Sequence, residues 1–272
     1  MPLSHYACAN CGFWQMHFAS PPDCPVCTDV RNDLPEDGWQ FLSEAEVAAT
    51  HAGGVREVAP GLWAFTTTPN LGLAGTGWLI VRDGGNIAFE AAPYYAAEML
   101  HQLRALGGIR FLSASHAHGY GALFQLQREF GPEVVAIQRE DLNMTKAFCV
   151  NAPFDDQLEL APGYTLHHVG GHYEGQAALH DAVGRRLFCG DMFKIEQDPA
   201  GISQAVSSHK AFHKNIPLTH AELRRYREAI APLEFDAALT PFEYAPEVTR
   251  SVALAVLDEA LARPPGVKRI AL

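Results

Sequence analysis

The stretch Ser115-His116-Ala117-His118-Gly119-Tyr120-Gly121 does most to decide the fold, because it follows directly on a strand predicted over residues 109–113. A loop at a strand end would project both imidazoles outward. A third histidine, His172, and a carboxylate, Asp191, follow two further predicted strands. Each residue alone is an ordinary loop side chain, but in this order the four predict one metal site. Three histidines with an open fourth position are typical of catalytic zinc.

The elements around this stretch predict a mixed α/β fold. Strands are expected over residues 62–68, 76–82 and 86–90, followed by a helix over residues 93–106. After residue 163 we expect four strands and two helices. The strands lie at 164–169, 177–181, 186–189 and 236–240, and the helices at 219–231 and 246–262. Strands in hairpins, then strands alternating with helices, indicate sheets whose outer faces are covered by helices.

Four of the six cysteines form two Cys-x-x-Cys knuckles, Cys8-Ala9-Asn10-Cys11 and Cys24-Pro25-Val26-Cys27. Each knuckle presents two thiolates to one tetrahedral ion, for which zinc is the default and iron an alternative. We assign residues 1–45 to this unit, the cysteine module, and residues 46–272 to a second domain. The cysteine module is too short to bury a core of its own, so its metal is expected to supply folding energy.

The net charge and the distribution of apolar residues argue against two classes of function, nucleic-acid binding and membrane insertion. The chain has 272 residues, with Lys+Arg 20 against Asp+Glu 31, a net charge of −11. That charge repels phosphate backbones and disfavours general nucleic-acid binding. No apolar run approaches the ~18 residues of a membrane span, and the N-terminus lacks a signal pattern. We therefore expect a cytoplasmic protein whose cysteine knuckles bind metal and do not form disulfides.

The order of the motifs resembles the metallo-β-lactamase superfamily over about residues 55–245. The matching stretches are the His-x-His segment at 115–121, Gly170-Gly171-His172 and Gly190-Asp191. The resemblance implies a four-layer αββα sandwich with the metal site at one edge. In residues 1–45 the knuckles, with Tyr6 and Gly12, also resemble rubredoxin, so the resemblance implies a zinc-ribbon or rubredoxin-like module ahead of the sandwich.

Two departures from the superfamily pattern bear on the chemistry. His116, His118 and His172 match the ligands of the first metal, and Asp191 matches the carboxylate that bridges two metals. Tyr120 and Gly121 replace two second-metal ligands, and residues 239–244 contain no late histidine. The resemblance therefore implies one metal, with Asp191 as its fourth ligand or as the residue that orients a bound water. The candidates for additional ligands are Glu243, His209 and His213, each of which is otherwise an ordinary polar side chain.

These residues favour a zinc-dependent hydrolase. A metal held by three histidines lowers the pKa of a bound water to about 7, so hydroxide is available for attack on a thioester, ester, lactone or amide. Asp191 would accept the proton of that water, and Tyr120 would protonate the leaving group. The metal could also be iron or manganese. The expected partners are a small-molecule substrate and a second copy or another protein bound through the cysteine module.

Two alternatives remain open from the sequence. The first is a catalytically degenerate sandwich that binds a metal or ligand and uses the cysteine module for protein contacts. The second is an iron-dependent redox protein, because rubredoxin-like modules occur beside this fold in electron-transfer proteins. The colour of the purified protein identifies the redox alternative, since iron bound by four thiolates is red and zinc is colourless.

Overall fold

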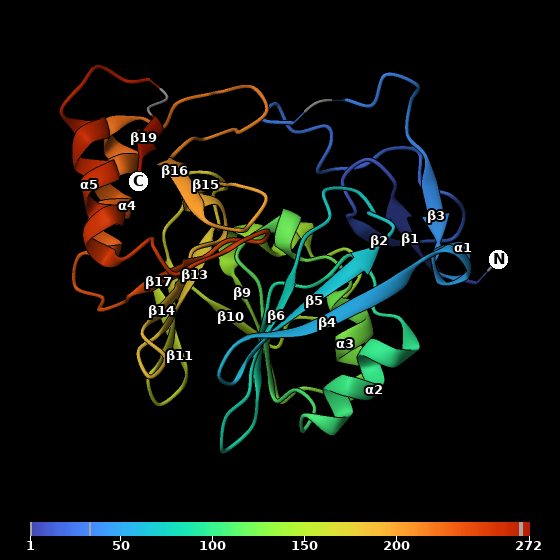
Figure 1. Ribbon diagram of the computed structural model, residues 1–272. Helices are drawn as coiled ribbons and strands as arrows, with labels where there is room; N and C mark the ends of the chain where they lie inside the picture. The colour runs from blue at the N-terminus through green and yellow to red at the C-terminus, as the bar shows by residue number, and fades with distance from the viewer. Residues whose placement is uncertain (1, 33, 267–268) are drawn as a thin grey trace. The chain divides into compact units, whose positions relative to one another are not determined.

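The computed structural model describes residues 2–32, 34–266 and 269–272 (Figure 1). The chain divides into two compact units, residues 1–137 with 142–153 and residues 138–141 with 154–272. The cysteine knuckles lie within the first unit, and the domain boundary near residue 45 stays a prediction. No helix in the described part of the chain has the length and hydrophobicity that a membrane crossing requires.

The first unit begins with a small antiparallel sheet that carries the first cysteine knuckle. Its strand order is β2-β1-β3, with β1 at Ser4–Cys8, β2 at Trp14–His17 and β3 at Phe41–Ser43. Helix α1 (Glu44–Thr50) follows β3 and starts at a capping box between Ser43 and Glu46. The side chain of Ser43 accepts from the amide of Glu46, and the Glu46 carboxylate accepts from the amide of Ser43.

A seven-stranded sheet forms the centre of the first unit, in the order β10-β9-β8-β7-β6-β5-β4. The strands are β4 (Ala52–Ala59), β5 (Leu62–Thr68), β6 (Gly77–Ile80), β7 (Ile87–Phe89), β8 (Phe111–Ser113), β9 (Val134–Gln138) and β10 (Ala152–Phe154). The parallel strands β7, β8 and β9 are joined by α2 (Ala97–Ala105) and α3 (Leu123–Phe130). Because β7 and β8 are parallel, the residues that follow them emerge at the same sheet edge.

The helix predicted over residues 93–106 begins four residues late, at Ala97. The amide of Tyr94 donates to the Thr67 hydroxyl at 3.0 Å, and the amide of Tyr95 donates to the Gln125 side chain at 2.8 Å. Side chains distant in sequence thus take the amide donors of these residues and hold them in a loop. The start of the predicted helix is therefore wrong, although its end is close.

The second unit is built on a six-stranded sheet in the order β11-β12-β13-β14-β17-β18. Its strands are β11 (Gln157–Ala161), β12 (Tyr164–His168), β13 (Ala177–Asp181), β14 (Arg186–Phe188), β17 (Ala237–Leu239) and β18 (Tyr244–Ala245). Helices α4 (His220–Ile230) and α5 (Arg250–Leu261) lie side by side (Figure 1). Their apolar faces share a core with β14 that includes Leu187, Tyr226 and Leu257.

A third small sheet completes the second unit, in the order β15-β16-β19. Its strands are β15 (Lys194–Gln197), β16 (Ser203–Ser207) and β19 (Arg269–Ala271). Strand β15 starts two residues after the short helical turn at Gly190–Met192. The predicted mixed α/β class is confirmed by this arrangement of sheets and helices.

Candidate metal centres

The first pair of predicted ligands lies just after β8. His116 has an extended backbone with φ −166°, and the short helical turn Ala117–Gly119 carries His118. Nδ1 of His116 is hydrogen-bonded to the Ser115 hydroxyl at 2.8 Å, so that Nε2 faces Nδ1 of His118 at 3.3 Å. Two nitrogen ligands at 2.0–2.1 Å from a tetrahedral zinc are about 3.3–3.4 Å apart. The observed spacing therefore fits one metal ion.

The ring of His116 is fully buried. Burial, assisted by the charge of Arg31, lowers the pKa of His116 to about 3. The imidazole is consequently neutral at physiological pH, and the neutral form is the one that binds a metal.

Glu90 holds the His-x-His segment and was not among the predicted site residues. Its side chain, 1% exposed, accepts from the amide of Ser115 at 3.3 Å. A Cβ atom at Gly119 would lie 1.6 Å from Glu90 Oε2, so only glycine allows this approach. The amide of Ala91 also donates to the Gly119 carbonyl at 2.9 Å. The signal in the sequence was an acidic residue at the end of a predicted buried strand, 86–90.

The second pair of predicted ligands lies in the second unit. His172 follows the turn Gly170-Gly171, where both glycines have positive φ (62° and 83°). The amide of His172 donates to the phenol oxygen of Tyr226 at 2.9 Å, and a Cβ at Gly171 would lie 2.4 Å from that oxygen. Nε2 of His172 lies 3.6 Å from Oδ2 of Asp191. This distance also fits two ligands of one ion.

All four predicted ligands belong to one group. His116, His118, His172 and Asp191 each offer one ligand atom, and these atoms lie within 4.8 Å of one another. Three of the four are buried and His118 is partly buried. The histidines and the carboxylate therefore form a candidate metal centre, as the sequence predicts.

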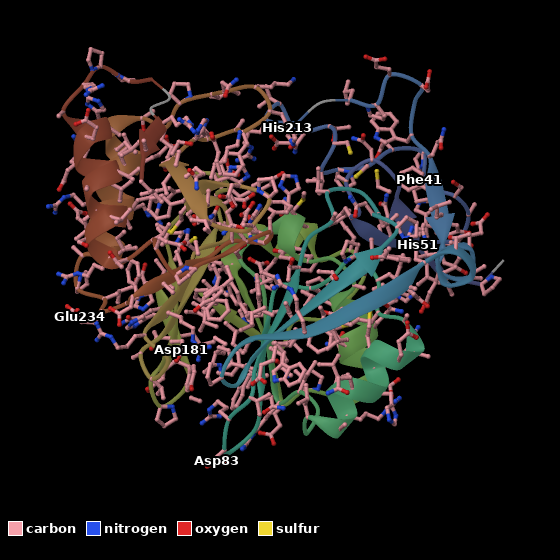
Figure 2. The ribbon with its side chains drawn as sticks, viewed as in Figure 1. Phe41, His51, Asp83, Asp181, His213 and Glu234 are labelled. Atoms are coloured by element: carbon pink, nitrogen blue, oxygen red, sulfur yellow. The ribbon has the colours of Figure 1, made fainter. Side chains whose placement is uncertain are left out.

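The candidates for additional ligands are not members of this group. Glu243 is partly exposed; burial, with a smaller effect of the Asp191 charge, raises its pKa to about 7, and a hydrogen bond from Thr240 opposes this. His209 is buried, with Nε2 hydrogen-bonded to the Ser207 hydroxyl at 2.7 Å. His213 is exposed on the loop before α4 (Figure 2). A role for these three residues in metal binding stays a prediction.

Tyr120, the predicted proton donor, is 2% exposed. Its ring packs edge-on against Phe148 with the centroids 5.3 Å apart. The side chain thus has a packing role, and its catalytic role stays a prediction.

The four knuckle cysteines form the other candidate metal group, which we call the thiol centre. Sγ of Cys8 lies 3.7 Å from Sγ of Cys27, and Sγ of Cys11 lies 3.6 Å from Sγ of Cys24. Four sulfur ligands at 2.3 Å from a tetrahedral zinc are about 3.8 Å apart. These distances fit a metal ion and are too long for a disulfide bond, in which the sulfur atoms are about 2.05 Å apart.

The surroundings of the thiols also suit a cation. Hydrogen bonds with the neighbouring thiols lower the pKa of Cys8 and Cys27, whereas the neighbouring thiols and burial raise the pKa of Cys11, so a positive charge nearby is needed to ionise that thiol. The side-chain amide of Asn10 donates to Sγ of Cys27 at 3.3 Å.

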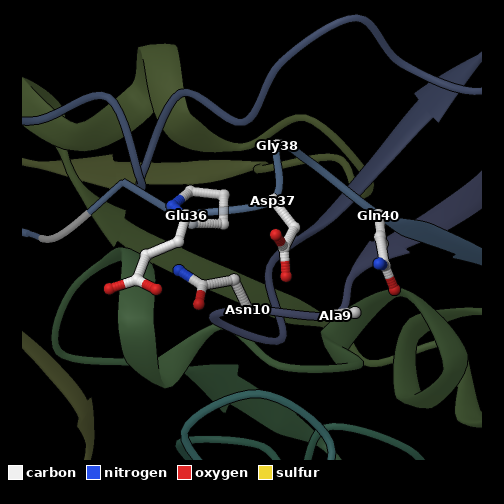
Figure 3. A pocket seen from close by; sticks show the side chains of 7 residues that line it. Ala9, Asn10, Glu36, Asp37, Gly38 and Gln40 are labelled. Atoms are coloured by element: carbon white, nitrogen blue, oxygen red, sulfur yellow. The ribbon is translucent and has the colours of Figure 1, made fainter.

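Beside the first knuckle lies a hollow of about 270 Å³ (Figure 3). Its lining is acidic and amide-rich: Ala9, Asn10, Pro35, Glu36, Asp37, Gly38 and Gln40.

Comparison with known structures defines the class of the fold. The chain superimposes on TMB-1 with a TM-score of 0.58 at 9% identity, covering 77% of this chain and 98% of TMB-1. The mono-zinc form of the metallo-β-lactamase FIM-1 from Pseudomonas aeruginosa gives a TM-score of 0.56 at 13% identity, covering 78% of this chain and 97% of FIM-1. A metallo-β-lactamase from Pontibacter korlensis gives a TM-score of 0.53 at 14% identity, covering 76% of this chain and 99% of that protein. The chain therefore has the metallo-β-lactamase fold.

Sequence comparison adds a relative without an assigned activity. No family model matches the chain. The uncharacterized protein YmaE of Bacillus subtilis (strain 168) is 24% identical over 249 residues, which cover 88% of this chain and 89% of YmaE. The likeness extends over nearly the full length of both proteins, and the name of that relative says nothing about function.

Proposed function

We propose that the protein is a metal-dependent hydrolase that uses a mononuclear centre of three histidines and Asp191 to hydrolyse a small carbonyl substrate. The observation that carries the proposal is the grouping of four ligand atoms within 4.8 Å, in a fold shared with metallo-β-lactamases. Zinc is the metal that suits three imidazoles and one carboxylate. The substrate classes that fit are thioesters, esters, lactones and amides.

A single metal is supported by position 121, where the superfamily pattern places a histidine. Gly121 has φ 37°, and a Cβ atom there would lie 2.3 Å from the carbonyl oxygen of Ala91. The backbone therefore leaves no room for a ligand side chain at this position. Without a second metal, phosphodiester cleavage is disfavoured because two-metal clamping suits it best.

The residues of the chain divide the chemical work. Zinc, when bound, supplies a Lewis acid and a water of lowered pKa. With the metal held by the three histidines and the fourth position left to water, Asp191 would orient that water and accept its proton. Ser115 keeps the ring of His116 in one orientation through its hydrogen bond. Tyr120 donates a proton to the leaving group. This last role requires the phenol to reach the substrate from its buried position.

Metal content tests the proposal directly. Inductively coupled plasma mass spectrometry on the wild type should give two metal ions per chain, one in each candidate group. The double variant His116→Ala/His118→Ala should give one. A control that replaces the exposed His17 and His101 by alanine should keep two. The fully loaded protein is then assayed against thioesters, esters, lactones and amides.

Each result has a distinct meaning. One metal ion in both the wild type and the double variant, even after added zinc, would refute the hydrolase proposal and favour the degenerate ligand-binding protein. Red protein with iron in the thiol centre would favour the redox protein instead. We also propose a cytoplasmic location, and a second copy of the chain or another protein as the partner of the cysteine module.

A further inference from the structure

Two parts of the cysteine module act on the surroundings of His116 and His118: one packs against flanking residues, and the other carries a charged pair. The first contact is made by Trp14, which follows the first knuckle and is 2% exposed. Its indole nitrogen donates to the carbonyl of Pro93 at 2.7 Å, and the centroid of its ring lies 5.0 Å from that of Phe124. His5 stacks on the same Phe124 ring at 4.0 Å.

The residues that Trp14 contacts flank the histidine segment. Phe124 lies in the first turn of α3, six residues after His118. Pro93 follows Ala91 and Ala92, which pair with the segment itself: the amide of Ala91 donates to the Gly119 carbonyl, and the carbonyl of Ala92 accepts from the Ala122 amide, each at 2.9 Å. Displacing Trp14 would therefore loosen both flanks of the segment.

The second part is the turn that follows Cys27, which carries an ion pair. The carboxylate of Asp29 accepts from the Arg31 amide at 2.9 Å and from Nε and Nη2 of the Arg31 guanidinium at 2.6 Å each. Arg31 is 8% exposed, and this bidentate pairing holds its guanidinium in one place. The positive charge of Arg31 contributes to the lowered pKa of His116, and the charge of His118 contributes to the lowered pKa of Asp29. The ion pair is therefore close enough to the two histidines to act on them electrostatically.

The second knuckle itself supports this turn. The amide of Thr28 donates to the Cys24 carbonyl at 3.1 Å, and the amide of Asp29 donates to the Val26 carbonyl at 3.2 Å. The side chain of Asn32 donates to the same Val26 carbonyl at 2.8 Å. The position of Arg31 therefore depends on the order of the Cys24–Cys27 knuckle, and a segment this short depends on its metal for that order.

We propose that the metal-loaded cysteine module positions His116 and His118, so that the two metal centres of this protein load cooperatively. The inference rests on metal binding at the histidine centre and not on hydrolysis. Coupling between two binding sites is reciprocal, so each metal raises the affinity for the other by the same factor. Coupling of the usual size changes affinity by about 5–150-fold. If the proposal is wrong, the hydrogen bond from the Ser115 amide to Glu90 is enough to hold the histidine segment in place without the cysteine module.

Cobalt titration of the metal-free, full-length protein reads the two centres separately. Thiolate-to-metal charge transfer marks the thiol centre, and weaker ligand-field bands mark the nitrogen and oxygen centre. The double variant Cys24→Ser/Cys27→Ser should bind cobalt at the histidine centre about 5–150-fold more weakly than the wild type. In the converse experiment, His116→Ala/His118→Ala should weaken the thiol centre by the same factor.

Milder variants keep the proposal testable if the cysteine variant fails to fold. Trp14→Phe removes the donor to Pro93, and Arg31→Lys loses the bidentate pairing with Asp29 while it keeps the positive charge. Both should retain the charge-transfer bands and weaken the histidine centre. The control Arg104→Met removes an exposed ion pair with Glu129 in the same unit and should change neither centre.

Hydrogen exchange supplies a readout that needs no metal at the histidine centre. In the histidine double variant, loading the thiol centre with zinc should slow exchange of the amides of Ala91 and Ala122. Unchanged exchange, or wild-type cobalt affinity at the histidine centre of the cysteine variant, would overturn the coupling. An empty histidine centre in the wild type refutes the proposed function alone, because exchange still decides whether the module positions the segment.

Discussion

The phenol oxygen of Tyr226 is the acceptor for the backbone amide of His172, so replacing Tyr226 by phenylalanine removes one contact and little volume. The side chain is fully buried, and the hydrogen bond measures 2.9 Å. A buried donor left without an acceptor costs about 1–3 kcal/mol. Partners of this kind that orient a metal ligand typically change metal affinity by about 10–100-fold. A tenfold change corresponds to about 1.4 kcal/mol, so the two ranges agree.

The cost should appear mainly when metal is bound. In the metal-free protein the turn at Gly170-Gly171 can relax and expose the amide of His172 to water, whereas a bound metal fixes the position of that residue. We therefore expect Tyr226→Phe to weaken zinc binding about 10–100-fold, measured by competition with a chromophoric chelator. Urea unfolding of the metal-free variant should show a smaller loss of stability.

A matched control separates this effect from general destabilisation. The hydroxyl of Thr67, which is 5% exposed, accepts from the amide of Tyr94 at 3.0 Å. Thr67→Val likewise leaves a buried amide without its acceptor, and it also removes the donor to the Tyr94 carbonyl, but at a site that holds no metal ligand. It should lower the free energy of unfolding by about 1–3 kcal/mol and leave zinc affinity unchanged. Equal zinc affinity in Tyr226→Phe and the wild type would refute the reasoning.

Three further predictions concern neighbouring residues. Gly119→Ala should lower the free energy of unfolding by about 1–3 kcal/mol, because the new Cβ meets the Glu90 carboxylate; an unchanged urea midpoint would contradict it. Ser115→Ala frees the ring of His116 and should weaken zinc binding about 10–100-fold in the chelator competition, and undiminished affinity would show that the hydroxyl does not orient the ring. Glu243 has its pKa raised from 4.5 to about 7, so the folded, metal-free protein retains a proton that the unfolded chain releases. Its stability should fall as pH rises through that interval, and Glu243→Gln should abolish this component of the urea midpoint's pH dependence.

The sequence was sufficient to predict the elements with a visible pattern and to single out the residues that the structure groups as candidate ligands. Strands β5 and β13 match the predicted ranges 62–68 and 177–181, because alternating or continuous apolar residues mark them. The four residues of the candidate centre were singled out by their order at successive strand ends and by the resemblance to the metallo-β-lactamase superfamily. Such local signals need no knowledge of what packs against them.

Features that depend on packing between residues distant in the chain could not be predicted from the sequence. Strand β4 passes through Gly53 and Gly54, which lack the side chains that make a strand pattern visible. A Cβ atom at Gly53 would lie 1.8 Å from the sulfur of Met99 on α2, so the glycine is required by a helix that is distant in sequence. The supporting role of Tyr226 was hidden for the same reason, since 54 residues separate it from His172.

The backbone of Glu90 sets a limit on engineering this protein for heat resistance. Its φ of 61° lies in the left-handed region, which glycine and asparagine occupy at lower energy than glutamate. A stability screen would therefore favour Gly or Asn at this position. Such a substitution would release the strain and remove the carboxylate that holds Ser115, so the more heat-resistant variants would lose order where the metal binds. Strain concentrated beside a functional segment is the usual origin of a trade-off between robustness and activity.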